Sequence, residues 1–113
     1  MKPKRWEGLE EEILALVKEY FPDARRARGS GSVHGDGDVL GIPGVYIDAK
    51  DQSGTSGYTV KKTEWEKARQ QAARQYPPKH AVIVTRNKEG SIVAHCDLDL
   101  LLLALSYIPD GTL

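Results

Sequence analysis

The sequence has a single cysteine, one methionine and one phenylalanine, and it has no long uninterrupted hydrophobic segment. The lone Cys96 excludes an internal disulfide and a zinc site built from several cysteines. The longest apolar run, Leu98 to Leu105, is interrupted by Asp99 and is too short to span a bilayer. No apolar segment follows the basic start of the chain, so we expect an intracellular protein without a signal peptide.

A net charge is also missing, because 16 basic and 16 acidic residues cancel. Bulk charge therefore does not indicate a nucleic-acid partner. The basic residues nevertheless gather in three clusters: Lys2, Lys4 and Arg5; Arg25, Arg26 and Arg28; and Lys61, Lys62, Lys67, Arg69 and Arg74. Solvated faces of mixed charge account for most clusters of this kind. At 113 residues, the chain is expected to form one domain over residues 1–113.

Periodicity and turn residues predict eight elements in the order αβββαββα. The predicted helices are Trp6–Phe21, ended by Pro22; Thr63–Gln75, started by a capping box from Thr63 to Glu66; and a last helix between Asp97 and Pro109. The predicted strands are Ala24–Arg28, Asp38–Leu40, Val45–Lys50, Ala81–Thr85 and Ser91–His95. This order predicts an α/β domain with a mixed central sheet flanked by helices.

One acidic residue of the first helix falls on its apolar side. At 100° per residue, the apolar side chains cover one broad arc: Leu9, Ile13, Leu14, Leu16, Val17, Tyr20 and Phe21. Glu10 lies inside that arc, whereas Glu11 and Glu12 lie outside it. A carboxylate on an apolar face is costly unless it is paired or bound to a metal. Glu10 is therefore a candidate functional residue.

An acid-x-Lys tripeptide, Asp48-Ala49-Lys50, ends the third predicted strand. Side chains at positions i and i+2 of a strand share a face, so Asp48 and Lys50 are expected to point the same way. Asp38 heads the preceding strand, across a tight turn, and could approach the same ion as Asp48. Asp36 is an alternative candidate for this upstream metal ligand. Asp38 is preferred because an apolar strand residue follows it.

These residues together predict a metal site. Hard divalent ions such as Mg²⁺ take oxygen ligands, typically one or two carboxylates with waters and a substrate phosphate. We expect Glu10, Asp38 and Asp48 to hold Mg²⁺ or Mn²⁺, and Lys50 to act beside the water that the metal delivers. For any one of these residues, a strand-end acid paired with a nearby base is the simpler interpretation. The four together favour a catalytic site.

The pattern resembles the PD-(D/E)xK nuclease superfamily, and within it the archaeal-type and phage Holliday junction resolvases. The resemblance spans about residues 7–105. Glu10 is similar to the family's helix glutamate, and Arg28-Gly29-Ser30-Gly31 to its arginine/serine–glycine loop. Gly37-Asp38-Val39 resembles the strand start, and Ile47-Asp48-Ala49-Lys50 the (E/D)-x-K strand end. The chain departs from close resolvases at Asp48, where they usually have Glu.

The resemblance implies a restriction-endonuclease-like core and a homodimer that nicks two opposed strands of a four-way DNA junction. It also implies a cytoplasmic protein of a bacterial, archaeal or phage-infected cell, with no membrane association. Basic residues near the acids could bind the DNA backbone: Arg25, Arg26, Arg28, Ser30, and Lys61 and Lys62 before the second helix. Two alternatives stay open, a related nuclease acting on flaps or mismatches and a non-catalytic DNA-binding module of the same fold.

Other motifs are incomplete. The glycine-rich segment Gly29–Gly37 lacks the Gly-Lys-Ser/Thr of a phosphate-binding loop, and Leu40 and Ile47 occupy positions where a calcium loop needs ligands. The three histidines, His34, His80 and His95, are not spaced as zinc ligands. No arrangement of Ser53, Thr55 and Ser56 indicates a nucleophile triad.

Overall fold

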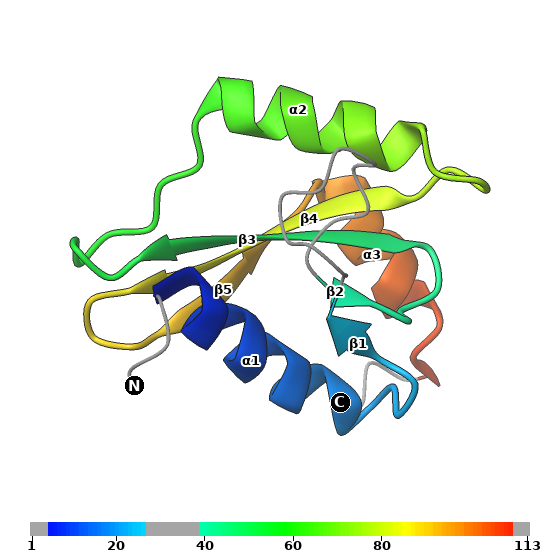
Figure 1. Cartoon of the computed structure of the whole chain (residues 1–113). Coiled ribbons are helices and arrows are strands. Elements are labelled where there is room, and N and C mark those ends of the chain that lie inside the picture. Colours follow the sequence, from blue (N-terminus) through cyan, green and yellow to red (C-terminus); the bar gives the residue numbers. More distant parts are fainter. Residues whose placement is uncertain (1–4, 27–38, 110–113) are drawn as a thin grey trace.

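A computed structural model describes residues 5–26 and 39–109, and this part of the chain forms three helices and a five-stranded mixed sheet (Figure 1). The predicted order αβββαββα is confirmed. The helices are α1 (Arg5–Lys18), α2 (Lys62–Ala73) and α3 (Leu98–Ser106). The strands are β1 (Arg25–Arg26), β2 (Val39–Leu40), β3 (Val45–Gln52), β4 (His80–Asn87) and β5 (Ile92–His95).

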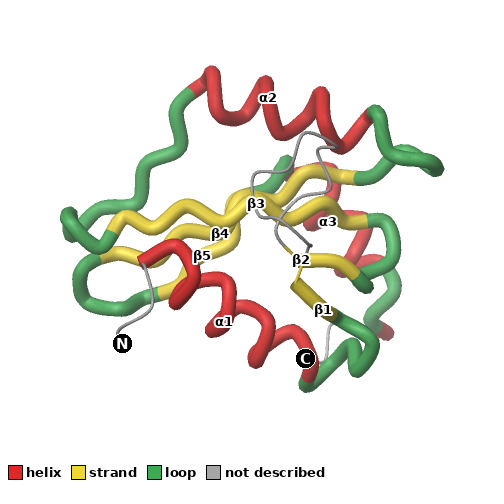
Figure 2. The backbone as a smooth tube through the Cα atoms, in the orientation of Figure 1, coloured by secondary structure: helices red, strands yellow, loops and turns green. Residues whose placement is uncertain are grey.

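The strands lie in the sheet in their sequence order, β1-β2-β3-β4-β5. Neighbouring strands are antiparallel except β3 and β4, which are parallel and pair over eight residues, from Val45 with His80 to Gln52 with Asn87. A parallel pair needs a crossover connection, and α2 supplies it. Helix α2 thus covers one face of the sheet, and α1 packs on the opposite face (Figure 2).

Alternation along β3 divides the core into two layers. Ile47 packs with Leu9 and Ile13 of α1, whereas Tyr46 packs with Ala68 and Ala72 of α2. Both faces of β3 are thus covered, as is usual for parallel strands. Asp48 and Lys50 follow Tyr46 at intervals of two residues, so they belong to the face covered by α2.

The first helix is shorter than predicted, because it ends at Lys18 instead of Phe21. The N–H groups of Tyr20 and Phe21 both bond to the carbonyl of Val17, which turns the chain before Pro22. Tyr20 is consequently 78% exposed, and Leu16 is 51% exposed. The prediction that these side chains lie on the buried arc was therefore wrong. Leu9 and Ile13 are buried as predicted.

The start of α2 also differs from the prediction. The helix begins at Lys62, and Glu64 rather than Glu66 closes the capping interaction, because its Oε1 accepts the backbone N–H of Lys61 at 3.1 Å. The earlier start places Glu64 at the third helical position, where a carboxylate can reach back to the N-cap.

Helix α3 begins after Asp97 as predicted, but it contains no buried residue. Leu98, Leu101, Leu102, Leu103 and Leu105 are each at least 40% exposed. The Asp97 side chain does not cap the helix and instead accepts a hydrogen bond from Arg69 of α2. Within the residues that the structure describes, no helix has both the length and the hydrophobicity needed to cross a membrane.

A nearly buried arginine ties α1 to the sheet. Arg86 of β4 donates from Nη2 to Asp51 at 2.8 Å and from Nη1 to Glu12 at 2.7 Å. The side chains of Arg86 and Asp51 are only 15% and 7% exposed. Burial alone raises the pKa of Asp51, but hydrogen bonds from Ser53 and Arg86 outweigh it, so the pKa lies below its ordinary value. The folded protein therefore favours the ionised form of the Asp51 carboxyl group.

The Asp51 contact predicts a pH-dependent contribution to stability. A carboxyl whose pKa is lower in the folded state stabilises the fold above its unfolded pKa, and this contribution is lost as pH falls through the folded value. We expect Asp51→Asn to lower the free energy of unfolding by about 2 kcal/mol near pH 7, with the difference shrinking below about pH 4. Urea unfolding of both proteins across this range measures it, and a difference independent of pH would contradict it.

Candidate active site

Asp48 and Lys50 lie side by side in the middle of β3, on the face covered by α2. The prediction that this strand ends at Lys50 was wrong, because it continues to Gln52. Their closest charged atoms, Lys50 Nζ and Asp48 Oδ2, are 3.6 Å apart. The Asp48 side chain is 22% exposed and that of Lys50 is 36% exposed, so both remain accessible to solvent. The expectation from strand alternation, that the two side chains share a face, is confirmed.

A third charged residue, Glu64, lies beside this pair. Lys50 Nζ is 3.9 Å from Glu64 Oε2, while Glu64 Oε1 caps the start of α2. The Lys50 ammonium thus lies between a strand carboxylate and a helix carboxylate. Sequence reasoning missed Glu64, because it assigned the capping role to Glu66 and gave no way to know how α2 crosses β3. The spacing of Glu64 from the first helical residue was the only available signal.

Glu10 is buried, as its place on the apolar arc predicted, and it is paired with a protein cation. It is 2% exposed, and its Oε2 accepts a hydrogen bond from Arg26 Nη2 at 2.7 Å. Glu11 Oε1 accepts a hydrogen bond from Nη1 of the same guanidinium at 2.9 Å. Burial lowers the pKa of Arg26, but the hydrogen bonds to Glu10 and Glu11 outweigh it and raise the pKa overall. Arg26 therefore stays charged and bound to α1.

Several predicted site residues fall outside the described part of the chain: Asp38, its alternative Asp36, Arg28 and Ser30. The sequence places Asp38 directly before Val39, and Val39 pairs with Ile47, the residue before Asp48. The described part of the chain contains four predicted DNA-binding residues. Arg26 is bonded to Glu10 and Glu11, whereas Arg25 is exposed on β1, and Lys61 and Lys62 are exposed at the start of α2. Lys62 is 89% exposed and lies 3.8 Å from Glu66.

The same face of the sheet carries a hydrogen-bonded pair next to the site. Thr85 is the partner of Lys50 in the β3–β4 ladder, and it is fully buried. Its Oγ1 lies 2.9 Å from Nε2 of His95 on β5. The buried hydroxyl of Thr85 is thereby satisfied.

The donor chemistry at Asp48 fits a hard divalent cation, since carboxylate oxygens are the ligands that Mg²⁺ prefers. Among the residues described, however, no group of three or more His, Cys, Asp or Glu side chains is arranged to hold a metal ion. Asp48 and Glu64 supply carboxylates next to Lys50, whereas the buried carboxylate of Glu10 is bonded to Arg26. A metal bound by Glu10 must therefore compete with a guanidinium.

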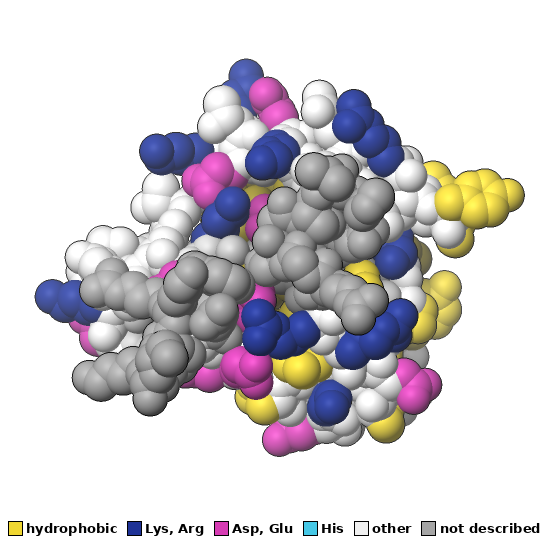
Figure 3. Space-filling model, in the orientation of Figure 1, with side chains coloured by type: hydrophobic (Ala, Val, Ile, Leu, Met, Phe, Trp, Pro, Cys, Tyr) yellow, Lys and Arg dark blue, Asp and Glu magenta, His cyan; other side chains and the backbone are white. Residues whose placement is uncertain are grey.

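Charged side chains lie along α2, the helix that crosses the face of Asp48 and Lys50. Figure 3 shows Lys and Arg side chains across α2 at the top of the face, with Asp and Glu side chains among them. Such mixed charge can steer a phosphate backbone locally even though the chain has no net charge.

Comparisons with protein-family models, with curated proteins and with solved structures find no match to this chain.

Proposed function

We propose that this protein is a metal-dependent DNA endonuclease of the PD-(D/E)xK type, and that it resolves Holliday junctions in the cytoplasm as a homodimer. The observation that carries the proposal is the placement of Asp48 and Lys50 on one accessible face of β3, with Nζ and Oδ2 3.6 Å apart. An acid and a lysine in this arrangement can serve a metal ion and a phosphate at the same place.

The fold supports the same proposal. Two strands precede the acid-x-Lys strand, and the three are paired antiparallel. A crossover helix follows, and the next strand returns parallel to the acid-x-Lys strand. Helices α1 and α2 cover opposite faces of this sheet. This arrangement agrees with the restriction-endonuclease-like core that the sequence resemblance implies.

In the proposed mechanism, the residues of the chain have distinct roles. Asp48 and Asp38 would hold Mg²⁺ or Mn²⁺. Glu10 belongs to α1, which covers the other face of the sheet, so it would join them only by releasing Arg26 and reaching the metal from that side. The bound metal would supply an activated water and neutralise charge on the scissile phosphate. The Lys50 ammonium orients the attacking water or neutralises the pentavalent phosphate, and Glu64 holds that ammonium in place.

Phosphate binding around the site is assigned to exposed cations. Arg25, Lys61 and Lys62 remain candidates for the DNA backbone because they are exposed. Arg28 and Ser30 keep this role on their sequence pattern alone. Arg26 is assigned instead to holding Glu10 and Glu11, since both terminal nitrogens of its guanidinium are bonded to these carboxylates.

The homodimer has support from α3. A monomer gains nothing from a nine-residue helix that displays five leucines to water, and extended apolar patches mark association surfaces. A two-fold dimer buries the same patch on both subunits. Two subunits would also supply the two active sites that paired cleavage of a four-way junction requires.

The first prediction concerns catalysis. Asp48→Asn and Lys50→Ala are each expected to reduce DNA cleavage at least about 100-fold, because each removes a charge that acts on the scissile phosphate. Folding and DNA binding should be retained, since both side chains are partly exposed. Cleavage of a labelled four-way junction with Mg²⁺ measures the rate. Lys88→Ala, on the exposed β4–β5 turn, is the matched control. Full cleavage activity of both site variants would contradict the assignment of Asp48 and Lys50 as catalytic residues.

The second prediction concerns the substrate. In one buffer, we expect paired, symmetric nicks in a four-way junction and much slower cleavage of a flap, a mismatched duplex and a linear duplex. Faster cleavage of a flap or a mismatched duplex would support the nuclease assignment but contradict the four-way junction as its substrate. A chain that sediments as a monomer in the presence of junction DNA would remove the paired-nick mechanism.

A non-catalytic DNA-binding module is the second candidate function. The observation favouring it is that Glu10 already has a protein cation as partner, while the described residues contain no three-residue metal cluster. Calorimetric titration with Mg²⁺ and Mn²⁺ near neutral pH separates the two functions. Binding that Asp48→Asn abolishes supports the nuclease. No heat of binding, with or without DNA, supports the module.

A further inference from the structure

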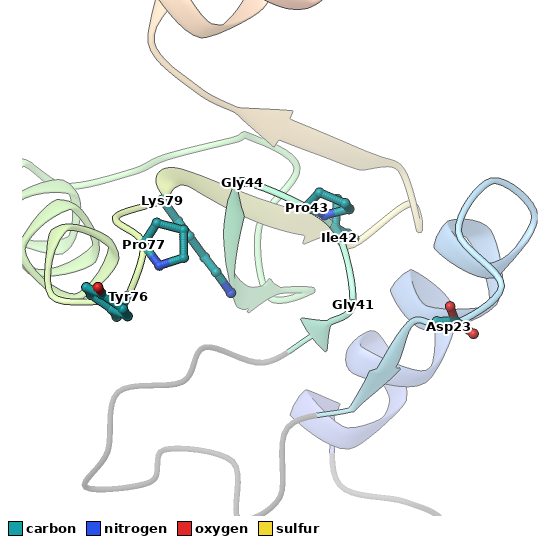
Figure 4. A pocket seen from close by; sticks show the side chains of 8 residues that line it. All are labelled: Asp23, Gly41, Ile42, Pro43, Gly44, Tyr76, Pro77 and Lys79. Atoms are coloured by element: carbon teal, nitrogen blue, oxygen red, sulfur yellow. The ribbon is translucent and has the colours of Figure 1, made fainter.

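A shallow cavity of about 540 Å³, widely open to solvent, lies beside the start of β3 (Figure 4). One wall comes from the segment after α2, with Tyr76, Pro77 and Lys79, and the other from the β2–β3 turn Gly41–Gly44 and Asp23. The two walls are joined, because the N–H of His80 bonds to the carbonyl of Gly44 at 2.8 Å. The volume is in the range of small-ligand sites.

The β2–β3 turn is held closely against the chain before β1. Gly41 has a φ of +93°, and a side-chain carbon at this position would come within 2.7 Å of the Asp23 carbonyl oxygen. Only glycine fits here without moving the backbone. This wall of the cavity is therefore fixed by backbone contact, whereas the opposite wall carries the chemically distinctive side chains.

Tyr76 presents a full aromatic face beside this cavity. Its side chain is 101% exposed, so it contributes no burial to the fold. Single exposed aromatics are ordinary on protein surfaces. Tyr76 differs because it lines this cavity together with Pro77 and Lys79, and Pro77 lies between the other two side chains in Figure 4. A ring, an apolar surface and an ammonium together suit a nucleobase with its phosphate.

Helix α2 connects this cavity with the site. Glu64 and Gln71 mark the side of the helix that meets β3, through Lys50 and the Tyr46 hydroxyl. Lys67 and Arg74 are exposed and lie within about 60° of Gln71 around the helix axis. Arg69 lies on the other side, where it bonds to Asp97. Two cations thus follow the β3 side of α2 from the site toward the cavity.

The length of α2 sets the distance along the DNA between a phosphate at Lys50 and a base at Tyr76. Twelve residues of helix extend about 18 Å, which is the axial rise of about five base pairs of B-form DNA, and an extended single strand covers this distance in fewer nucleotides. A strand whose phosphate lies at Lys50 can therefore pass Lys67 and Arg74 and reach Tyr76. A base paired in a duplex cannot place its face on Tyr76, so the cavity suits an unpaired base.

We propose that the Tyr76 cavity binds an unpaired nucleobase of DNA, stacked on the Tyr76 ring, with Lys79 contacting the adjoining phosphate. This rests on the proposed function for the identity of the ligand, and it names the substrate class more closely. The preferred DNA has an unpaired base a few nucleotides from the phosphate held at Lys50, as occurs at a branch point with disrupted pairing.

The test uses binding without divalent cations, so that no cleavage occurs. The probe is a thymidine oligonucleotide of about ten residues carrying one 2-aminopurine, which reports stacking by loss of fluorescence. Tyr76→Ala is expected to weaken binding about 10-fold and to abolish the quenching, whereas Tyr76→Phe keeps both. Lys79→Gln should weaken binding and reduce its salt dependence by about one phosphate contact.

The matched control is Tyr107→Ala, because Tyr107 is also highly exposed, at 80%, but lies after α3. It should bind the probe like the unaltered protein, and none of the variants should change affinity for a fully paired duplex of the same length. The proposal is overturned if the unaltered protein does not bind the single strand, if Tyr76→Ala binds it equally well, or if Tyr107→Ala loses as much.

The outcome is independent of catalysis. If Asp48→Asn and Lys50→Ala cleave DNA normally while Tyr76 controls single-strand binding, the nuclease assignment fails and the nucleobase cavity stands. If cleavage depends on Asp48 and Lys50 while Tyr76→Ala changes neither binding nor quenching, the nuclease assignment stands and the cavity proposal fails.

Discussion

The parallel pairing of β3 with β4 is the constraint on which the rest of the structure depends. Eight residue pairs align the two strands, and a parallel pair obliges the chain to cross over one face of the sheet. Helix α2 makes this crossing on the face that carries Asp48 and Lys50. Its first turn therefore brings Glu64 to Lys50, and the segment after its last turn brings Tyr76 to the start of β3. The Asp48–Lys50 site and the Tyr76 cavity therefore lie near opposite ends of α2 in one β3–α2–β4 unit.

On the other face, two arginines hold α1. Arg26 binds Glu10 and Glu11, and Arg86 binds Glu12 together with Asp51. Three consecutive glutamates of α1 are thus neutralised by cations from the sheet. Where such pairs are desolvated, removing one partner leaves a buried charge, so each arginine constrains where α1 can lie. For Glu10, the same pairing sets a condition on the proposed metal site, because the free energy gained by metal binding must exceed the cost of releasing Arg26.

The sequence was sufficient for the parts of the fold that depend on local periodicity. Alternation placed Asp48 and Lys50 together, and the helical arc identified Glu10 as a buried carboxylate. It could not identify the partner of Glu10, because an ion pair between residues 16 positions apart depends on how α1 packs on β1. Glu64 was missed for the same reason. The leucines of α3 have a spacing that suits packing on a sheet equally well, and only their 40–65% exposure decides against it.

The same reasoning explains why the Tyr76 cavity had no signal in the sequence. Tyr76 continues the apolar stripe of Trp65, Ala68 and Ala72, so its spacing predicts a buried side chain. The helix ends at Ala73, however, and the chain turns before the ring can reach the sheet. The Tyr76 ring therefore lies outside the core, with its apolar face exposed and without core side chains to pack against. Beside Lys79 and a wall fixed at Gly41, that face is available to a ligand. The end of α2 therefore leaves at the surface a side chain whose spacing predicts a core position.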